Sequence, residues 1–256
     1  MNHHMSHRNH LWVAGLAVIA ISLAGCQQST KSQATSSGSQ SSQASQSSTK
    51  KAESAASASS SNNTVATMKN YQVPASEKQK KSYVKSGLLT IPGEFSYDKA
   101  GTKLTLKKKQ NSTRKTASTG LSYQMISTKM ITNSAKTSAA KQMAEQAFNV
   151  TTIANPYQTI QINFKINNQL DQDVRTDGIN KVVFNGTNTA TSASGLSDSS
   201  AGQTIKAHQT RTFHAMVLTG TADTTVTKLA IQFSGSFSAN GEKRSSSPKT
   251  LDVALN

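Results

Sequence analysis

The stretch YQTIQINFKINN, residues 157–168, carries the clearest indication of the fold. Its apolar side chains recur at every second position, at Ile160, Ile162, Phe164 and Ile166. Polar side chains fill the positions between them, at Gln161, Asn163, Lys165 and Asn167. Because successive side chains of a strand point to opposite faces of a sheet, this alternation predicts a β-strand with one buried face and one wetted face.

Further strands are predicted on both sides of this stretch. Comparable patterns occupy residues 88–91, 103–107, 121–131, 182–184, 211–218, 229–233 and 251–255. Within 121–131 the apolar parity changes between Met125 and Ile126, which suggests a β-bulge. Residues 211–218 are apolar on both faces after Thr212, as in a central strand. The polar stretch 185–200 is expected to form a long loop.

One short helix is predicted among the strands. Apolar residues follow helical spacing at Ala140, Met143, Ala144, Ala147 and Phe148. Thr137 or Ser138 can cap the start of this helix, and its narrow apolar stripe fits a helix that lies on a sheet. About eight strands and one helix predict an all-β fold, an antiparallel β-sandwich over residues 102–256.

Residues 1–25 have the composition of an export signal. An apolar run of twelve residues, 11–22, follows Arg8 and is shorter than the span of about 20 residues that a membrane-crossing helix needs. The run leads into Leu23, Ala24, Gly25 and Cys26, the only cysteine of the chain. This ending resembles the lipobox of bacterial lipoproteins, in which small residues precede a cysteine whose sulfur receives a diacylglyceryl group.

The resemblance implies that residues 1–25 are a lipoprotein signal peptide and that Cys26 is lipidated. The mature protein is then anchored to the cell membrane on its extracellular face. The alternative is an ordinary signal peptide, or an uncleaved anchor, whose cysteine stands here by chance. A single cysteine also excludes a disulfide within the chain.

Residues 26–67 are expected to form a disordered, serine-rich linker behind the lipidated cysteine. Between residues 27 and 63 there are fifteen serines and six glutamines, with no aromatic or large aliphatic residue. Such a composition cannot bury enough apolar surface to offset the entropy of ordering. We therefore expect a flexible tether between the membrane and the folded domain.

A basic lead-in segment, residues 68–101, is predicted to precede the sandwich. The chain has 28 basic and 12 acidic side chains, a net charge of +16, and the excess is concentrated in residues 69–115. Counterion release draws such a stretch to polyanions. The candidate contacts are Lys78, Lys80, Lys81, Lys107, Lys108, Lys109, Arg114 and Lys115.

Outside the cytosol, the polyanions expected as partners are lipid headgroups and wall polymers such as teichoic acids. Nucleic acid is disfavoured by the predicted compartment and by the lack of aromatic residues interleaved with the lysines. The alternative for the basic stretch is a solvated face that keeps the protein soluble.

A wider resemblance covers residues 103–255. The lipobox and the serine-rich tether are followed by a long strand leading into Asn167, Asn168, Gln169, Leu170 and Asp171, and later by Ala201, Gly202, Gln203, Thr204 and Ile205. This order resembles the immunoglobulin-like lipoprotein domains of unknown function in Gram-positive bacteria. The resemblance implies an immunoglobulin-like sandwich and no established activity. The helical stretch and the loop 185–200 depart from that pattern.

No catalytic, cofactor or metal site is predicted. Outside the first ten residues the only histidines are His208 and His214, and no Gly-x-Ser-x-Gly motif accompanies them. We expect His214 to pack in a core or interface beside Met216 and Leu218. Asp171, Asp173 and Asp177 offer oxygen ligands, but Arg175 occupies a ligand position of a calcium loop, which favours a hydrogen-bonded turn.

The sequence therefore predicts a non-catalytic interaction module that binds a cell-envelope component or a partner protein, not an enzyme. The alternative is a cell-wall-directed hydrolase whose site is formed by scattered carboxylates, because their separation is not readable from sequence.

Overall fold

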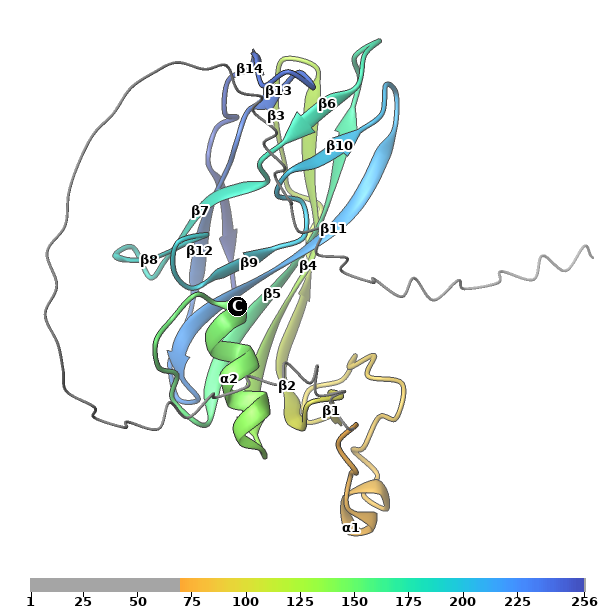
Figure 1. Cartoon of the computed structure of the whole chain (residues 1–256), viewed down its shortest axis with the longest axis vertical. Helices are drawn as coiled ribbons and strands as arrows, with labels where there is room; N and C mark the ends of the chain where they lie inside the picture. The colour runs from red at the N-terminus through yellow and green to blue at the C-terminus, as the bar shows by residue number, and fades with distance from the viewer. Residues whose placement is uncertain (1–69, 256) are drawn as a thin grey trace, which may run out of the picture. The chain divides into compact units, whose positions relative to one another are not determined.

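The structure, a computed structural model, describes residues 70–255 (Figure 1). The predicted signal peptide, the lipobox with Cys26, the serine-rich linker 26–67 and the first two residues of the lead-in lie outside the described residues. The helices are α1 (Ala75–Lys78) and α2 (Ser138–Ala147). The strands are β1 (Phe95–Tyr97), β2 (Thr102–Asn111), β3 (Lys115–Ser118), β4 (Leu121–Ala135), β5 (Tyr157–Asn168), β6 (Val174–Thr176), β7 (Ile179–Phe184), β8 (Asn188–Thr191), β9 (Leu196–Asp198), β10 (Gln203–Ile205), β11 (Thr210–Thr221), β12 (Lys228–Phe233), β13 (Ser236–Phe237), β14 (Lys243–Ser245) and β15 (Leu251–Ala254).

The strands form two layers of antiparallel sheet. One layer is a seven-stranded sheet in the order β1-β2-β4-β5-β11-β9, with β3 paired to β4. The other consists of two four-stranded sheets, β10-β6-β13-β14 and β15-β12-β7-β8. Side chains from both layers share one hydrophobic core. The predicted antiparallel β-sandwich is confirmed.

Strand β5 is the centre of the large sheet and the main contributor to the core. Its apolar side chains at 160, 162, 164 and 166 are fully buried, as the alternation predicted. They meet the second layer at Phe233, whose ring lies 5.2 Å from that of Phe164 and 4.5 Å from that of Tyr123. The Tyr123 hydroxyl donates to the Ser234 carbonyl at 3.1 Å, so this aromatic cluster also joins the layers by a hydrogen bond.

The strand pairing of the large sheet shifts register at three places, one of them between Leu218 and Gly220 of β11. The pairing of β4 with β5 shifts between Met125 and Ser127, which confirms the predicted bulge. A second shift, between Leu106 and Lys108 of β2, was not predicted. The extra residue at a bulge reverses the alternation of the strand. Residues after the bulge therefore point to the opposite face from the one that the pattern before it would give them.

Helix α2 covers part of the side of the large sheet that faces away from the core. Thr137 caps it by accepting a hydrogen bond from the Ala140 N–H at 3.0 Å. Phe148, just after the helix, packs edge-on against Tyr157, with 6.4 Å between the ring centroids. The same cluster includes Met216 and Leu218 of β11. The predicted helix and its position on a sheet are therefore confirmed (Figure 1).

Residues 70–101, the described part of the lead-in predicted for 68–101, supply the edge strand β1 of the large sheet and pack against its neighbours. Phe95 of β1 lies opposite Thr105 of β2, and Leu89 packs with Leu106 and Ile131. The segment also contains α1, a one-turn helix that the sequence analysis did not predict. Glu77 in this helix accepts hydrogen bonds from Lys103 and Lys80, which lower its pKa to about 2.

Two of the predicted elements are wrong. Residues 88–91 are a loop and not a strand, because the Glu94 carboxylate accepts the N–H groups of Thr90 and Ile91 that a strand would offer to a neighbour. Residues 185–200 are not one loop, since they contain β8 and β9. The buried side chains of Ala190 and Leu196 anchor these two strands to the core.

We predict that Phe164→Ala lowers the free energy of unfolding by about 4 kcal/mol, because it opens a cavity at the centre of the core. Chemical denaturation followed by circular dichroism measures this change. Lys165→Ala is the matched control on the exposed face of the same strand and should change the free energy by less than about 0.5 kcal/mol. Equal effects of the two variants would contradict the assigned direction of β5.

Candidate functional site

The candidate site is the outer face, the side of the seven-stranded sheet that points away from the shared core. Helix α2 covers one end of this face on β5 and β11, and residues 70–101 cover the neighbouring end on β2 and β4. The remaining part of the outer face bears polar and basic side chains. This uncovered part is the candidate binding surface.

Directly opposed residues form three rows across the uncovered part. The first row is Lys109, Lys129 and Gln161, and it ends at Met216, which lies under the cluster of helix α2. The second is Asn111, Ser127, Asn163 and His214. The third is Lys115, Gln124, Lys165 and Thr212. Residues opposite each other on neighbouring strands have Cβ atoms about 5 Å apart, so the four lysines and the amides form one surface.

Lys109 and Lys129 place two like charges opposite each other. The pKa of Lys129 is lowered by partial burial and then by the charge of Lys109, while Glu94 acts in the opposite direction. Like charges in directly opposed positions destabilise a sheet. Neither ammonium, nor those of Lys115 and Lys165, forms an ion pair with a carboxylate of residues 70–255. The outer face therefore carries positive charge that the folded domain does not neutralise by direct pairing.

A hollow of about 360 Å³ lies at the edge of this surface. Its lining includes Asn111, Gln124 and Lys165, together with Ile126 at the bulge. Nearby, the Asn163 side-chain amide donates to the Ser127 hydroxyl at 3.1 Å. Amide and hydroxyl groups beside an ammonium provide donors and acceptors for a ligand that carries both anionic groups and hydroxyls.

The predicted polyanion contacts are only partly brought together. Lys109 and Lys115 lie on the outer face, and Arg114 is exposed just before β3. Lys107 lies at the unexpected bulge of β2. Lys108 turns to the inner side of the sheet, where its ammonium donates to the Leu255 carbonyl at 3.4 Å. The bulge therefore divides the run of three lysines between different directions.

The other predicted contacts lie in the segment around α1. Lys80 is engaged by Glu77, whereas Lys78 and Lys81 are exposed. Two lysines of the outer face, Lys129 and Lys165, were not among the predicted contacts. The alternation of β5 places Lys165 on the wetted face, so that signal was present in the sequence. For Lys129, the change in apolar parity at the bulge was the feature of the sequence that indicated an outward direction.

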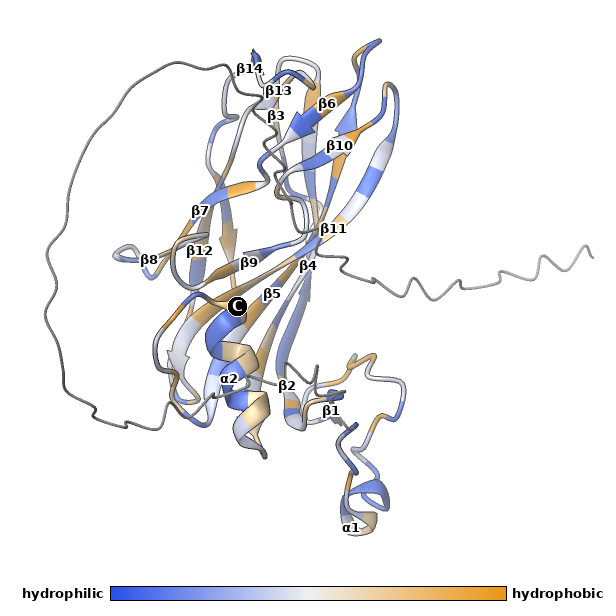
Figure 2. Ribbon diagram, in the orientation of Figure 1, coloured by the Kyte–Doolittle hydropathy of each residue, from blue (hydrophilic) through white to orange (hydrophobic). Residues whose placement is uncertain are grey.

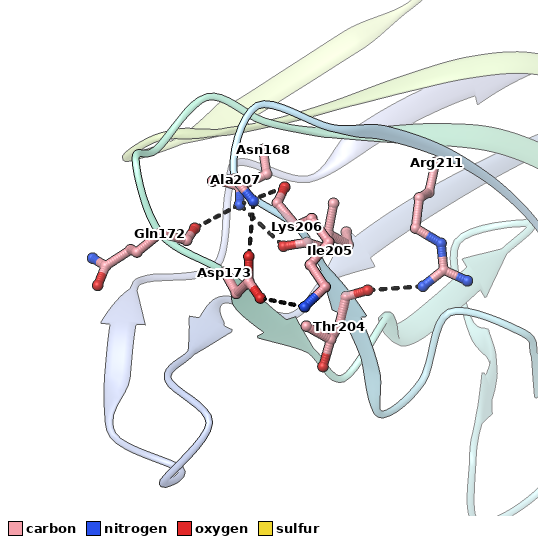
Figure 3. A network of polar contacts seen from close by, with 8 residues as sticks. All are labelled: Asn168, Gln172, Asp173, Thr204, Ile205, Lys206, Ala207 and Arg211. Atoms are coloured by element: carbon pink, nitrogen blue, oxygen red, sulfur yellow. Dashed lines mark hydrogen bonds and ion pairs between the residues drawn. The ribbon is translucent and has the colours of Figure 1, made fainter.

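The Asn-containing turn after β5 is held by a network of hydrogen bonds that stabilises the fold (Figure 3). The Asn168 side chain is fully buried, and its Nδ2 lies 2.8 Å from the Gln172 carbonyl and 3.1 Å from those of Ile205 and Lys206. Its Oδ1 accepts the Leu170 N–H at 3.0 Å. One amide thus joins the two segments on which the wider resemblance is based, the turn after β5 and the turn after β10.

The aspartates of this region serve as hydrogen-bond acceptors in turns. Asp173 accepts from the Lys206 ammonium at 2.7 Å and from the Ala207 N–H at 3.0 Å, and these contacts lower its pKa. Asp171 pairs with His208 at 3.0 Å, and Asp177 with Arg175 at 3.6 Å. Within residues 70–255, no cluster of three or more His, Cys, Asp or Glu side chains is able to hold a metal ion.

A serine, a histidine and an aspartate, the residue types of a serine hydrolase, lie close together beside β9. Their hydrogen bonds stabilise the strands and do not form a catalytic arrangement. The Ser199 hydroxyl donates to the main-chain carbonyl of His214 at 2.8 Å and accepts its N–H at 3.0 Å. Burial raises the pKa of the Asp198 carboxyl, which accepts hydrogen bonds from Ile179 and Ser200. In this arrangement the serine is bonded to the backbone of the histidine strand and not to an imidazole base.

The prediction that His214 packs in a core is wrong, whereas the alternative of an interface stays a prediction. His214 does share a strand face with Met216 and Leu218, as expected from the spacing. Helix α2 and the residues after it cover those two side chains and leave the imidazole exposed on the outer face. How much of the sheet a helix covers depends on tertiary packing and cannot be read from the spacing of the strand residues, which explains the error.

The described part of the chain has no helix that is both long and apolar enough to cross a bilayer. No protein-family model, curated protein or solved structure matches the chain.

We predict that Asn168→Ala lowers the free energy of unfolding by about 3 kcal/mol, because the carbonyls of Gln172, Ile205 and Lys206 lose the hydrogen bonds from the buried Asn168 amide. Chemical denaturation measures the change. Asn167→Ala, at the neighbouring half-exposed position, should cost less than about 0.5 kcal/mol. If both variants are equally stable, the network does not hold the two turns together.

Proposed function

We propose that the chain is a membrane-anchored extracellular lipoprotein of the immunoglobulin-like kind found in Gram-positive bacteria, with its lipid on Cys26. Its β-sandwich is a non-catalytic module that binds an anionic polymer of the cell envelope, such as a teichoic acid. The lipobox, the short apolar run and the serine-rich composition of residues 27–63 support the anchor.

The opposed pair of Lys109 and Lys129 is the observation that carries the binding proposal. Lys109 is exposed and lies opposite the partly buried Lys129, and its charge lowers the pKa of Lys129 while Glu94 offsets part of this effect, so the repulsion costs free energy in the unbound protein. A bound phosphate placed between them removes that cost and gains charge-assisted hydrogen bonds. Lys165 and Lys115 extend the positive surface across further strands, which suits a ligand with repeated anionic groups.

The uncharged side chains of the outer face favour a phosphate polymer that bears hydroxyl groups. Gln124, Asn111 and Asn163 offer amides in the rows beside the lysines. Within residues 70–255 the exposed large hydrophobic side chains are Leu88, Ile91 and Met143, none of which is aromatic. Binding of nucleobases relies on aromatic stacking, so nucleic acid fits this face less well.

The contacts of the carboxylates support a binding role over hydrolysis. Glu77 holds two lysines, Glu94 caps a loop and Asp173 ties down a turn. Asp198, whose raised pKa would suit an acid catalyst, is occupied by main-chain and hydroxyl donors. General acid–base catalysis requires such a group to face a substrate.

We predict that the purified chain binds poly(glycerol phosphate) in a salt-dependent manner. If three phosphates are contacted, the association constant should fall about 20-fold between 50 and 200 mM salt, by counterion release. The triple variant Lys109→Gln/Lys129→Gln/Lys165→Gln should weaken binding at low salt and flatten this dependence. Isothermal titration calorimetry at several salt concentrations measures both effects.

The matched control removes three exposed charges of the second layer, by Lys181→Gln/Lys228→Gln/Lys243→Gln. Both triple variants have the same net charge, so a nonspecific electrostatic effect would weaken binding equally in the two. A loss confined to the outer-face variant supports the proposed site. Equal losses, or binding that does not respond to salt, would remove it.

We also predict that Cys26→Ser abolishes lipidation and releases the protein from the membrane fraction or leaves it unprocessed. Without the thiol no thioether to a diacylglyceryl group can form. Fractionation and intact-mass spectrometry of the native protein measure the outcome. An unchanged mass and an unchanged membrane fraction would contradict the proposed anchor.

A further inference from the structure

Loop 87–93, between α1 and β1, displays two aliphatic side chains to solvent. Leu88 is 71% exposed and Ile91 is 63% exposed, the two highest values among the exposed large hydrophobic residues of the described chain. Figure 2 shows hydrophobic positions on this loop, which projects beside β2 away from the core. Single exposed aliphatic residues are common on protein surfaces, but two on one short projecting loop are a feature that needs a reason.

The loop is held in a shape that keeps these side chains outside. The Glu94 carboxylate accepts the N–H groups of Thr90 at 2.6 Å and Ile91 at 2.9 Å. These hydrogen bonds lower the pKa of Glu94, which keeps the carboxylate charged. Leu89, between the two exposed positions, is only 3% exposed and packs on Leu106 and Ile131.

The base of the loop is fixed as well. The Gly93 N–H donates to the Leu106 carbonyl of β2 at 2.8 Å, and the Gly87 N–H donates to the Val84 carbonyl at 3.2 Å. Both glycines have positive φ angles, 92° and 75°, which other residues adopt at a cost. The loop is thus anchored at both ends and by its middle leucine, so it presents its apolar side chains without further ordering.

The surroundings of the loop are basic. Lys81, Lys85 and Lys99 are exposed in the same segment. Its acids are already engaged: Glu77 by two lysines, Asp98 by the N–H groups of residues 101 and 102, and Glu94 by those of Thr90 and Ile91. Exposed aliphatic side chains in a segment that also bears exposed lysines are the combination that peripheral proteins use to bind an anionic lipid surface.

We propose that loop 87–93 is a membrane contact, in which Leu88 and Ile91 enter the interfacial region of an anionic lipid bilayer while the nearby lysines meet its headgroups. A bilayer offers both an apolar region and negative charge, whereas a hydrophilic phosphate polymer gives the aliphatic side chains no partner. The contact sets the orientation of the domain on the membrane, which a flexible tether alone does not define. The inference shares the membrane address with the proposed function but does not depend on the polymer site.

A single fluorophore on the loop tests the contact in the full chain. In a Cys26→Ser background, Ile91→Cys is labelled with nitrobenzoxadiazole and mixed with vesicles of phosphatidylglycerol and phosphatidylcholine in equal parts. The emission should shift to the blue and be quenched by nitroxide-bearing lipids. Met143→Cys, an exposed apolar position on α2, is labelled in the same way and should show neither effect.

Residues 1–69 are common to both labelled chains, so any membrane binding of their own does not produce a difference between the probes. A second variant, Leu88→Ser/Ile91→Ser, should reduce partition of the unlabelled Cys26→Ser chain into these vesicles by about tenfold. The Lys109→Gln/Lys129→Gln change should leave the blue shift at residue 91 intact, which separates this contact from the polymer site.

Three outcomes would overturn the proposal. The first is an unchanged emission at residue 91 when vesicles are added. The second is an equal shift at residue 143, which would indicate nonspecific adsorption. The third is an emission at residue 91 that is already blue-shifted in buffer, which would show that another part of the chain covers the loop.

Discussion

The burial of one face of β5 is the constraint on which the rest of the structure depends. The strand is hydrogen-bonded to β4 on one side and β11 on the other, and its side chains at 160, 162, 164 and 166 are fully buried. Because alternate side chains leave opposite faces, this burial forces Gln161, Asn163 and Lys165 outward. The same apolar pattern that builds the core therefore also builds the central column of the candidate binding surface.

The bulge in β4 links the core to the charge pattern of the outer face. Before the bulge, Tyr123 and Met125 point into the core; without it, Lys129 would share their direction. The extra residue, Ile126, reverses the parity and brings Lys129 outward, opposite Lys109. Burying an unpaired ammonium in the core would cost far more than the repulsion between the two lysines. The bulge is thus part of how this chain places its charges.

Local patterns were sufficient for β5, β12, β15 and helix α2, because each has a regular apolar period in sequence, and for the first bulge, because the apolar alternation changes parity there. These patterns were insufficient where a contact with a residue outside the pattern determines the local structure. The apolar residues 88–91 form a loop because Glu94 takes their N–H groups, and β8 and β9 exist because Ala190 and Leu196 reach the core. Lys108 turns inward because of a bulge that has no signal in a run of three lysines. The candidate site was predicted only in part for the same reason. Its lysines come from four strands, and the sequence of a single strand does not show which strands it pairs with.

The central claim is that an anionic polymer binds on the outer face of the seven-stranded sheet. Nuclear magnetic resonance mapping of amide and lysine side-chain shifts during titration with poly(glycerol phosphate) tests it most directly. The account predicts that the largest changes fall on Lys109, Lys129, Asn163 and Lys165, with little change in β7, β12 and β15. Shifts concentrated on those three strands of the second layer, or spread evenly over all exposed lysines, would contradict it.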